Sequence, residues 1–346
     1  MTNLTNFRQP LPDFHSGTAN GEETQGQSVT LYRWEMPDPR KTVAYFGPAG
    51  TFTEEALLSQ SDLEGLTLVT RLAIGDVLEA VDRGEVAYGF VPIENAIEGT
   101  VNAAIDGLVF DVDLRIVREV VLDIHLYLMA PSGTAIEDVR TVRSFPHALS
   151  QCRRFIAERL GGAETVAANS TADAARQLGE HPEAGCAAIA PRLAASLYGL
   201  DILAEAIEDH PDNQTRFVLV AKSGVPERTG HDRTSIVCFQ DADRPGSLYG
   251  ILGQFAARNI NLTKLESRPT KQGLGDYCFV IDLDGHLADE VVADCLTELR
   301  ASVTDVKFLG SYPTAGIEAQ ASREAVTARR DAARSWVSTL LKEPRV

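Results

Sequence analysis

The chain has 346 residues, of which 44% are hydrophobic and 7% aromatic. This length exceeds one ordinary domain and supplies enough apolar side chains for a large core, so we expect two or more folded domains. The formal net charge of −17 argues against nonspecific binding to nucleic acid or to anionic membranes, although a local positive pocket for a small anion is compatible with it.

The chain begins with a polar segment that is followed by an alternating pattern. Residues 1–40 are rich in Gly, Thr, Asn, Gln and Pro without sustained periodicity, so we expect a disordered extension there. From residue 41 to residue 222, short apolar strands alternate with helical patterns, which is typical of an α/β domain. The expected strands are residues 43–46, 66–69, 86–91, 116–129, 164–167, 187–190 and 217–221.

A second folded unit follows a break in the pattern. Residues 223–233 combine glycine, proline and charged residues, which predicts an exposed linker. The next segments predict the order βαββαβ, a ferredoxin-like module. They are residues 234–239, 247–258, 262–267, 277–283, 289–302 and 306–312. Residues 314–346 are rich in Ala, Arg and Glu and are expected to form a helical tail, either packed on the body or a partner or solvated.

The cysteines and the absence of long apolar runs predict the location. The five cysteines lie far apart with no Cys-x-x-Cys pair, which indicates reduced thiols and predicts neither a zinc site nor a disulfide framework. No apolar run approaches the roughly 18 to 20 residues of a membrane span, and the N-terminal segment has no signal-peptide pattern. We therefore expect a cytoplasmic protein without a metal and without membrane contact.

The densest polar chemistry lies directly before the last strand of the α/β domain. There Asn213, Thr215 and Arg216 lead into an apolar run that starts at Phe217. Ligands of open α/β sheets bind where loops meet strand ends, so Thr215 is a candidate acid or substrate holder. The alternative is an ordinary turn, because Pro, Asp, Asn and Gln are also common turn residues.

Other junctions of the same domain carry polar residues. The glycine-rich turn before Thr51 precedes a helical pattern, and its backbone N–H groups are candidates to hold a carboxylate. Glu94 and Asn95 follow the strand at residues 86–91, while Ser144 and Gln151 flank a helix start. Turn formation and helix capping are the alternative roles of these residues.

Taken in chain order, these segments resemble the prephenate dehydratase family, whose members convert prephenate to phenylpyruvate with loss of water and carbon dioxide. The resemblance covers about residues 42–313. Its marks are Gly47-Pro48-Ala49-Gly50-Thr51-Phe52, Val91-Pro92-Ile93-Glu94-Asn95 with Glu98-Gly99, residues 144–152, Ser170-Thr171-Ala172 and Asn213-Gln214-Thr215-Arg216-Phe217. Three positions depart from the family pattern: Phe145 and His147, which are therefore poor candidates for catalysis, and Asn169, which cannot serve as an acid.

The resemblance implies an α/β fold in which a two-lobed, periplasmic-binding-protein-like catalytic domain precedes an ACT domain. The catalytic domain is expected at residues 41–222, with one lobe at about 41–120 plus 203–222 and the other at 121–202. The ACT domain is expected at residues 234–313. Within it, residues 244–249 and 266–269 match the two phenylalanine-binding segments of the family.

The resemblance also implies a role for each candidate residue. Thr215 is expected to donate a hydrogen bond or proton to the departing ring hydroxyl, within a catalytic group completed by Glu94, Asn95, Ser144 and Gln151. The expected substrate contacts are Thr51, Phe52, Thr53, Asn213, Arg216 and Phe217. No cofactor is expected. Phenylalanine is expected to bind between paired ACT domains of a homodimer or homotetramer, at Gly246, Ser247, Leu248, Asn261, Leu262, Thr263, Glu266 and Ser267.

Two other functions stay open from the sequence. An arogenate dehydratase would perform the same chemistry on the amino-acid analogue of prephenate. A non-catalytic sensor of an aromatic ligand would use the two-lobed fold for binding alone. The polar N-terminal segment is too short for a chorismate mutase domain, so we expect a monofunctional enzyme.

Overall fold

The computed structural model describes residues 42–240, 245–271, 276–315 and 335–339. The expected N-terminal extension lies outside these ranges, as does most of the expected C-terminal tail, of which residues 335–339 are helical. In the described ranges, no helix is both long and apolar enough to span a bilayer.

The first lobe is built on a mixed sheet with the strand order β2-β1-β3-β11-β5, to which the short β4 is added beside β3. Its strands are β1 (Thr42–Phe46), β2 (Thr67–Arg71), β3 (Tyr88–Asn95), β4 (Gly99–Thr100), β5 (Arg115–Asp123) and β11 (Gln214–Ala221). Its helices are α1 (Phe52–Leu58), α2 (Ile74–Asp82) and α3 (Asn102–Asp106), with a 3₁₀ turn η1 (Ser61–Leu63) and a π-helical turn η2 (Gly107–Asp111). Strand β11 pairs antiparallel with both β3 and β5.

The second lobe has its own sheet, in the order β10-β6-β9-β7-β8. Its strands are β6 (Tyr127–Ala130), β7 (Thr141–Ser144), β8 (Glu164–Ala167), β9 (Cys186–Ala190) and β10 (Asp201–Ala204). Its helices are α4 (Pro146–Gln151), α5 (Arg153–Arg159), α6 (Thr171–Glu180) and α7 (Arg192–Tyr198), with a 3₁₀ turn η3 (Ile136–Asp138). The central strand β9 is buried along its whole length, which explains its continuous run of small apolar residues.

The chain passes between the lobes twice. It leaves the first sheet after Asp123 and enters the second at Tyr127, and it returns between Ala204 and Gln214. The expected single strand at residues 116–129 is therefore two strands in different sheets. The apolar pattern could not reveal this break, because Ile124 and Leu126 in the connection are also buried.

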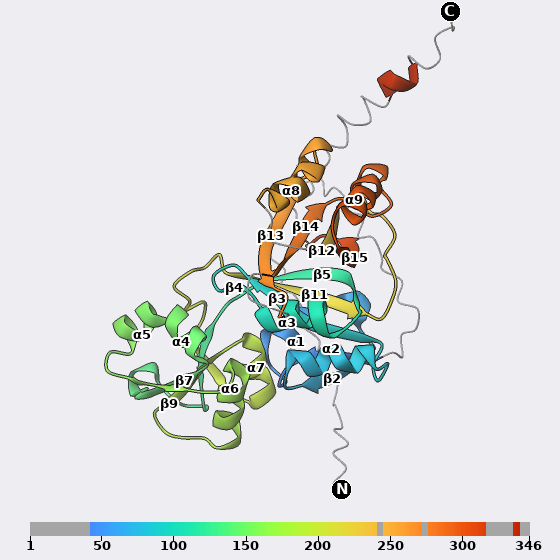
Figure 1. The fold of residues 1–346 in the computed structure, drawn as a ribbon. Helices are drawn as coiled ribbons and strands as arrows, with labels where there is room; N and C mark the ends of the chain where they lie inside the picture. Colours follow the sequence, from blue (N-terminus) through green and yellow to red (C-terminus); the bar gives the residue numbers. More distant parts are fainter. Residues whose placement is uncertain (1–41, 241–244, 272–275, 316–334, 340–346) are drawn as a thin grey trace, which may run out of the picture. The chain divides into compact units, whose positions relative to one another are not determined.

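The C-terminal module, residues 232–313, has the predicted βαββαβ order and an antiparallel sheet β13-β14-β12-β15. Its elements are β12 (Asp232–Phe239), α8 (Ser247–Ala257), β13 (Leu262–Pro269), β14 (Tyr277–Asp284), α9 (Glu290–Ser302) and β15 (Asp305–Pro313). Figure 1 shows α8 and α9 on the same face of this sheet, where their apolar residues share a core with β12 and β14.

The other face of that sheet packs on the first lobe. Val237, Val280 and Leu309 belong to the same buried core as Ile116 of β5. The closest approach is at Gly310, where a Cβ atom would lie 2.2 Å from the backbone oxygen of Ile116. The predicted fold class, a two-lobed α/β domain followed by a ferredoxin-like module, is confirmed, and the first lobe and the module share one apolar core.

Candidate active site

Asn95 and Thr215 stand opposite each other on β3 and β11. The Asn95 Nδ2 atom donates to the Thr215 hydroxyl oxygen at 2.9 Å and to the Asn213 Oδ1 atom at 2.9 Å. The orientation of the Asn95 amide is fixed because its Oδ1 atom accepts from the backbone N–H groups of Ile97 and Glu98. A threonine hydroxyl that accepts this bond keeps its own proton for donation to another group.

A chain of hydrogen bonds runs from this pair into the second lobe. Asn213 Nδ2 donates to Gln151 Oε1 at 3.3 Å, and Gln151 Nε2 donates to Glu98 Oε1 at 3.4 Å. The other Glu98 oxygen lies 2.9 Å from His147 Nδ1. Gln151 and His147 are on α4 of the second lobe, whereas Glu98 precedes β4 of the first lobe. The polar chain from Thr215 to His147 therefore joins the two lobes.

The glycine-rich turn after β1 also contacts both lobes. Gly50 has a φ of +86°, and its N–H group donates to Glu54 Oε2 at 2.7 Å. Tyr198 of α7 donates its hydroxyl hydrogen to the Ala49 carbonyl oxygen at 2.7 Å. Thr51 is the N-cap of α1 and accepts from the Glu54 N–H.

The next two predicted substrate contacts, Phe52 and Thr53, are held in the body of the protein. Phe52 packs against cores of both lobes, and Thr53 is 3% exposed. Of the three predicted substrate contacts in this segment, Thr51 and Phe52 are half-buried and Thr53 is buried.

Two further predicted site residues are part of the core in this structure. Ser144 is completely buried, and its hydroxyl donates to the Ile189 carbonyl oxygen at 2.6 Å. Phe217 stacks on Phe90 with ring centroids 5.5 Å apart and is 1% exposed. Ser144 thus ties β7 to β9, and Phe217 packs in the core two residues beyond Thr215 on β11.

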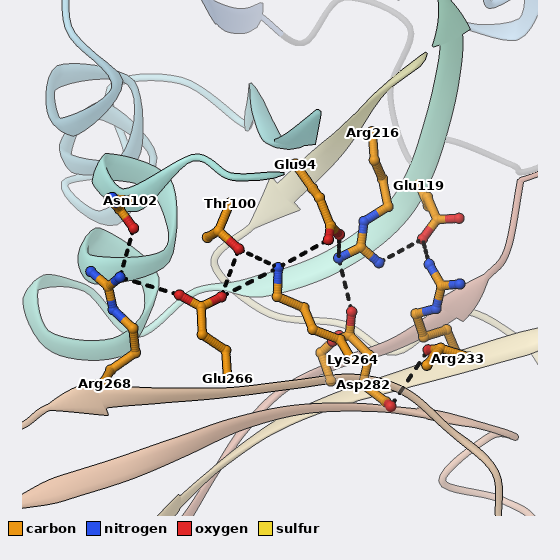
Figure 2. Close-up of polar contacts among 12 residues, drawn as sticks. Glu94, Thr100, Asn102, Glu119, Arg216, Arg233, Lys264, Glu266, Arg268 and Asp282 are labelled. Carbon is orange, nitrogen blue, oxygen red and sulfur yellow. Dashed lines mark hydrogen bonds and ion pairs between the residues drawn. The ribbon is translucent and has the colours of Figure 1, made fainter. Parts of the chain in front are cut away.

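The Arg216 and Glu94 side chains face the C-terminal module, where they pair with Asp282 and Lys264 (Figure 2). The Arg216 guanidinium lies 2.8 Å from Asp282 of β14, 3.1 Å from Glu94 and 3.3 Å from Glu119 of β5. Arg233 of β12 also pairs with Glu119. The structure therefore places Arg216, predicted as a substrate contact, in a buried ion cluster between the first lobe and the module.

A second part of this cluster comes from β13. Lys264 donates to the Thr100 hydroxyl oxygen at 2.8 Å and lies 3.5 Å from Glu94. Thr100 in turn donates to Glu266 Oε2 at 2.6 Å. Arg268 binds Asn102 at 2.6 Å and also pairs with Asp106. Figure 2 shows these side chains of β13 pointing toward the first lobe.

The cluster strongly favours its charged forms. Burial alone would raise the pKa of Asp282, but Arg216 and Arg233 hold it below its ordinary value of 3.8. Burial would lower the pKa of Arg216, yet the carboxylates of Asp282, Glu119 and Glu94 raise it overall. Replacing one member of such a pair leaves a buried charge without its partner, which costs about 3–5 kcal/mol.

We predict that Asp282 makes the protein sensitive to acid. A carboxyl group whose pKa is lowered by folding stabilises the folded state above its ordinary pKa, and this stabilisation is lost as the pH falls through the folded-state value. The free energy of unfolding should therefore fall below about pH 4. Urea unfolding followed by circular dichroism between pH 6 and pH 3 measures this fall. Asp282→Asn should start less stable at pH 6 and lose less stability than the wild type; parallel curves would contradict the assignment.

The expected effector residues fall into two groups at opposite ends of α8. Gly246, with a φ of +86°, caps the start of α8, and Ser247 and Leu248 follow it. Asn261, Leu262 and Thr263 lie where β13 begins, after the end of α8. Eleven helical residues span about 16 Å, so the two groups are separated within one chain. Glu266 and Ser267 lie further along β13.

Some residues of the ion cluster and of the polar chain were not predicted as site residues from the sequence. Glu119 and Asp282 are carboxylates next to buried apolar residues of their strands, a pattern that indicates a buried cationic partner. Glu98 and His147 form the end of the chain that leads to Thr215. Nothing in their spacing predicts this contact, because they come from different lobes.

The topology defines a two-lobed α/β protein with a C-terminal ferredoxin-like module, in which a chain of polar side chains joins the lobes. The prephenate dehydratase family model matches residues 43–225, and the ACT domain model matches residues 234–301. The chain belongs to the prephenate dehydratase family, a family of lyases, and has a C-terminal ACT domain.

Two of the similar proteins carry the name of this family, and a third has a different description. The prephenate dehydratase of Mycolicibacterium gilvum is 42% identical over 284 residues, which cover 79% of this chain and 91% of that protein. The prephenate dehydratase of Arthrobacter aurescens, solved in complex with L-Phe, is 40% identical with a TM-score of 0.74, covering 87% of this chain and all of the other. A structure described as GqqA, a novel type of quorum quenching acylase, is 28% identical with a TM-score of 0.72, covering 80% and 98% of the two chains.

Proposed function

We propose that this enzyme converts prephenate to phenylpyruvate, carbon dioxide and water, and that phenylalanine inhibits it through the ACT domain. The observation that carries the proposal is the Asn95–Thr215 hydrogen bond at the crossing between the lobes, in a chain about 40% identical to prephenate dehydratases. The relative described as an acylase is less similar, at 28% identity.

The chemistry requires help for the leaving hydroxyl. The electron pair of the bond between ring and carboxylate completes the aromatic ring as carbon dioxide leaves, and the ring hydroxyl departs on the opposite side with one added proton. Thr215 is a weak acid, so we assign it the role of a positioned donor to that oxygen. Asn95 fixes its orientation before the substrate binds, and such preorganised donors stabilise the charge that develops in the transition state.

The neighbouring groups support binding of the two substrate carboxylates. Asn213 and Gln151 lie one and two hydrogen bonds from Asn95 and are proposed to contact the substrate. The backbone N–H groups of Thr51 to Thr53 at the start of α1 are proposed to hold a carboxylate. In this scheme the reaction proceeds without a metal or organic cofactor.

Phenylalanine is proposed to bind at an interface between two ACT domains. Since α8 separates Gly246 from Asn261 within one chain, the first group of one copy and the second group of another copy would complete a site. Strand β13 is an edge of its sheet, and every second residue along it is exposed. Pairing of this edge with β13 of a second copy would cover the strand in both copies, so we propose a homodimer or a dimer of dimers.

Replacing Ser267 by alanine should weaken phenylalanine binding about tenfold, the effect of losing about 1.4 kcal/mol of contact. Prephenate turnover without phenylalanine should stay at the wild-type level. Isothermal titration with phenylalanine measures the affinity. The matched control is Ser302→Ala in the same domain, whose hydroxyl donates to the nearby Leu299 carbonyl oxygen; equal affinities of the two variants would contradict the site.

Arogenate separates the proposed function from its nearest alternative. Purified protein given prephenate should form phenylpyruvate, and given arogenate should form little phenylalanine. The reverse result would show an arogenate dehydratase, and no product from either compound would favour a binding protein. The cytoplasm is the proposed location, in keeping with five free and buried cysteines, which suit a reducing compartment.

A further inference from the structure

Thr215 and Asn95 lie on two paired strands, and next to each of them stands a residue that contacts the ACT domain. Thr215 is followed by Arg216 on β11, and Asn95 is preceded by Glu94 on β3. Successive side chains of a strand point to opposite faces. The register pairs Thr215 with Asn95 and Arg216 with Glu94, so one face of this strand pair holds the candidate catalytic groups and the other faces the ACT domain.

Strand β13 has the same two-sided arrangement. Lys264, Glu266 and Arg268 point to the first lobe, where they contact Thr100, Glu94 and Asn102. Ser267, between them, lies on the exposed face of the strand, and we place it at the proposed effector site. An effector that shifts β13 must therefore also shift the ion cluster.

Asp282 of β14 stands between β13 and Arg216 of β11. Lys264 and Asp282 are partners in the register of β13 and β14. Asp282 binds Arg216 with one oxygen, at 2.8 Å, and accepts from Ser235 with the other, at 2.5 Å. The Asp282 and Arg216 side chains are 4% and 11% exposed. Water and salt screen such a buried pair much less than a pair on the surface, so a displacement of Asp282 acts on β11 next to Thr215.

We propose that the Arg216–Asp282 contact, supported by Lys264 and Glu94, couples phenylalanine binding in the ACT domain to the position of the Thr215 hydroxyl. This inference rests on the proposed function. Arg216 is thus a positioning residue, one peptide unit from the proposed donor. Phenylalanine lowers turnover by favouring the arrangement in which this contact holds Thr215 away from its reacting position.

The test separates effector binding from the response to it. In the wild type, saturating phenylalanine should lower kcat/KM by roughly 5- to 150-fold, the usual range of allosteric coupling. Asp282→Asn should bind phenylalanine with nearly wild-type affinity in isothermal titration, while the coupling factor falls to about twofold or less. Lys264→Met removes the contacts of Lys264 with Thr100 and Glu94. This variant should also bind phenylalanine and respond weakly to it. It provides the test if Asp282→Asn does not fold.

Lys307→Met is the matched control. Lys307 also joins the ACT domain to the first lobe, by donating to the carbonyl oxygens of Val109 and Val112, and these hydrogen bonds reach η2 and the segment after it rather than β3 or β11. Its coupling factor should equal that of the wild type. Wild-type coupling in Lys264→Met and in folded Asp282→Asn would overturn the inference, and so would an equal loss in Lys307→Met. A wild type that ignores phenylalanine would instead contradict the regulatory part of the proposed function.

Discussion

Replacing Thr215 by valine is expected to lower kcat for prephenate by about 10²- to 10⁴-fold, the range that a general acid contributes. Valine keeps the shape of threonine but removes the hydroxyl to which Asn95 donates. Because the proposed donation acts mainly in the transition state, KM should change much less than kcat. Initial rates of phenylpyruvate formation measure both constants.

Two further variants show whether the hydroxyl itself matters. Thr215→Ser keeps a donor and should retain most of the activity. Thr141→Val makes the same change in β7 of the second lobe, outside the polar chain, and should leave kcat unaltered. A Thr215→Val enzyme that turns over prephenate as fast as the wild type would remove Thr215 from the mechanism.

Replacing Gly310 by alanine is expected to lower the free energy of unfolding by about 1–3 kcal/mol or more, the range for overpacked cores. The new Cβ atom would lie 2.2 Å from the Ile116 backbone oxygen and 3.0 Å from its backbone nitrogen. Backbone atoms cannot rotate away as a side chain can, so β15 and β5 must separate. Since both strands border one apolar core, the separation also weakens contact between the ACT domain and the first lobe.

Urea unfolding followed by circular dichroism tests this prediction against a matched variant. Gly75→Ala adds a methyl group in α2, where nothing lies within 4 Å of the new atom, and alanine suits a helix better than glycine. That variant should equal or slightly exceed wild-type stability. Gly310→Ala with wild-type stability would show that the two strands are less closely packed than described.

The sequence predicted the elements whose signals are local. The ACT strands and helices were placed to within a few residues, because alternating apolar residues and a long helical pattern are properties of short segments. Asn95, Gln151, Asn213 and Thr215, predicted to lie in one site, are joined by hydrogen bonds in the structure. Their chemical roles are still predictions.

The partners of the neighbouring side chains could not be predicted in the same way. Arg216 and Glu94 are adjacent to Thr215 and Asn95 on their strands and therefore point to the opposite face of the sheet, but the sequence does not show that the ACT domain binds them there. Which face meets which domain depends on packing between segments far apart in the chain. The crossing at residues 124–126 was hidden for a similar reason, since its apolar residues continue the pattern of the strands on both sides.

The most direct test of the central claim is the rate of phenylpyruvate formation from prephenate, followed by absorbance in alkali, with and without phenylalanine. Formation that phenylalanine suppresses is the predicted result, because it requires the two-lobed catalytic domain and a coupled ACT domain in one protein. Failure to form phenylpyruvate would contradict the proposed activity, and formation at an unchanged rate with saturating phenylalanine would contradict the proposed regulation.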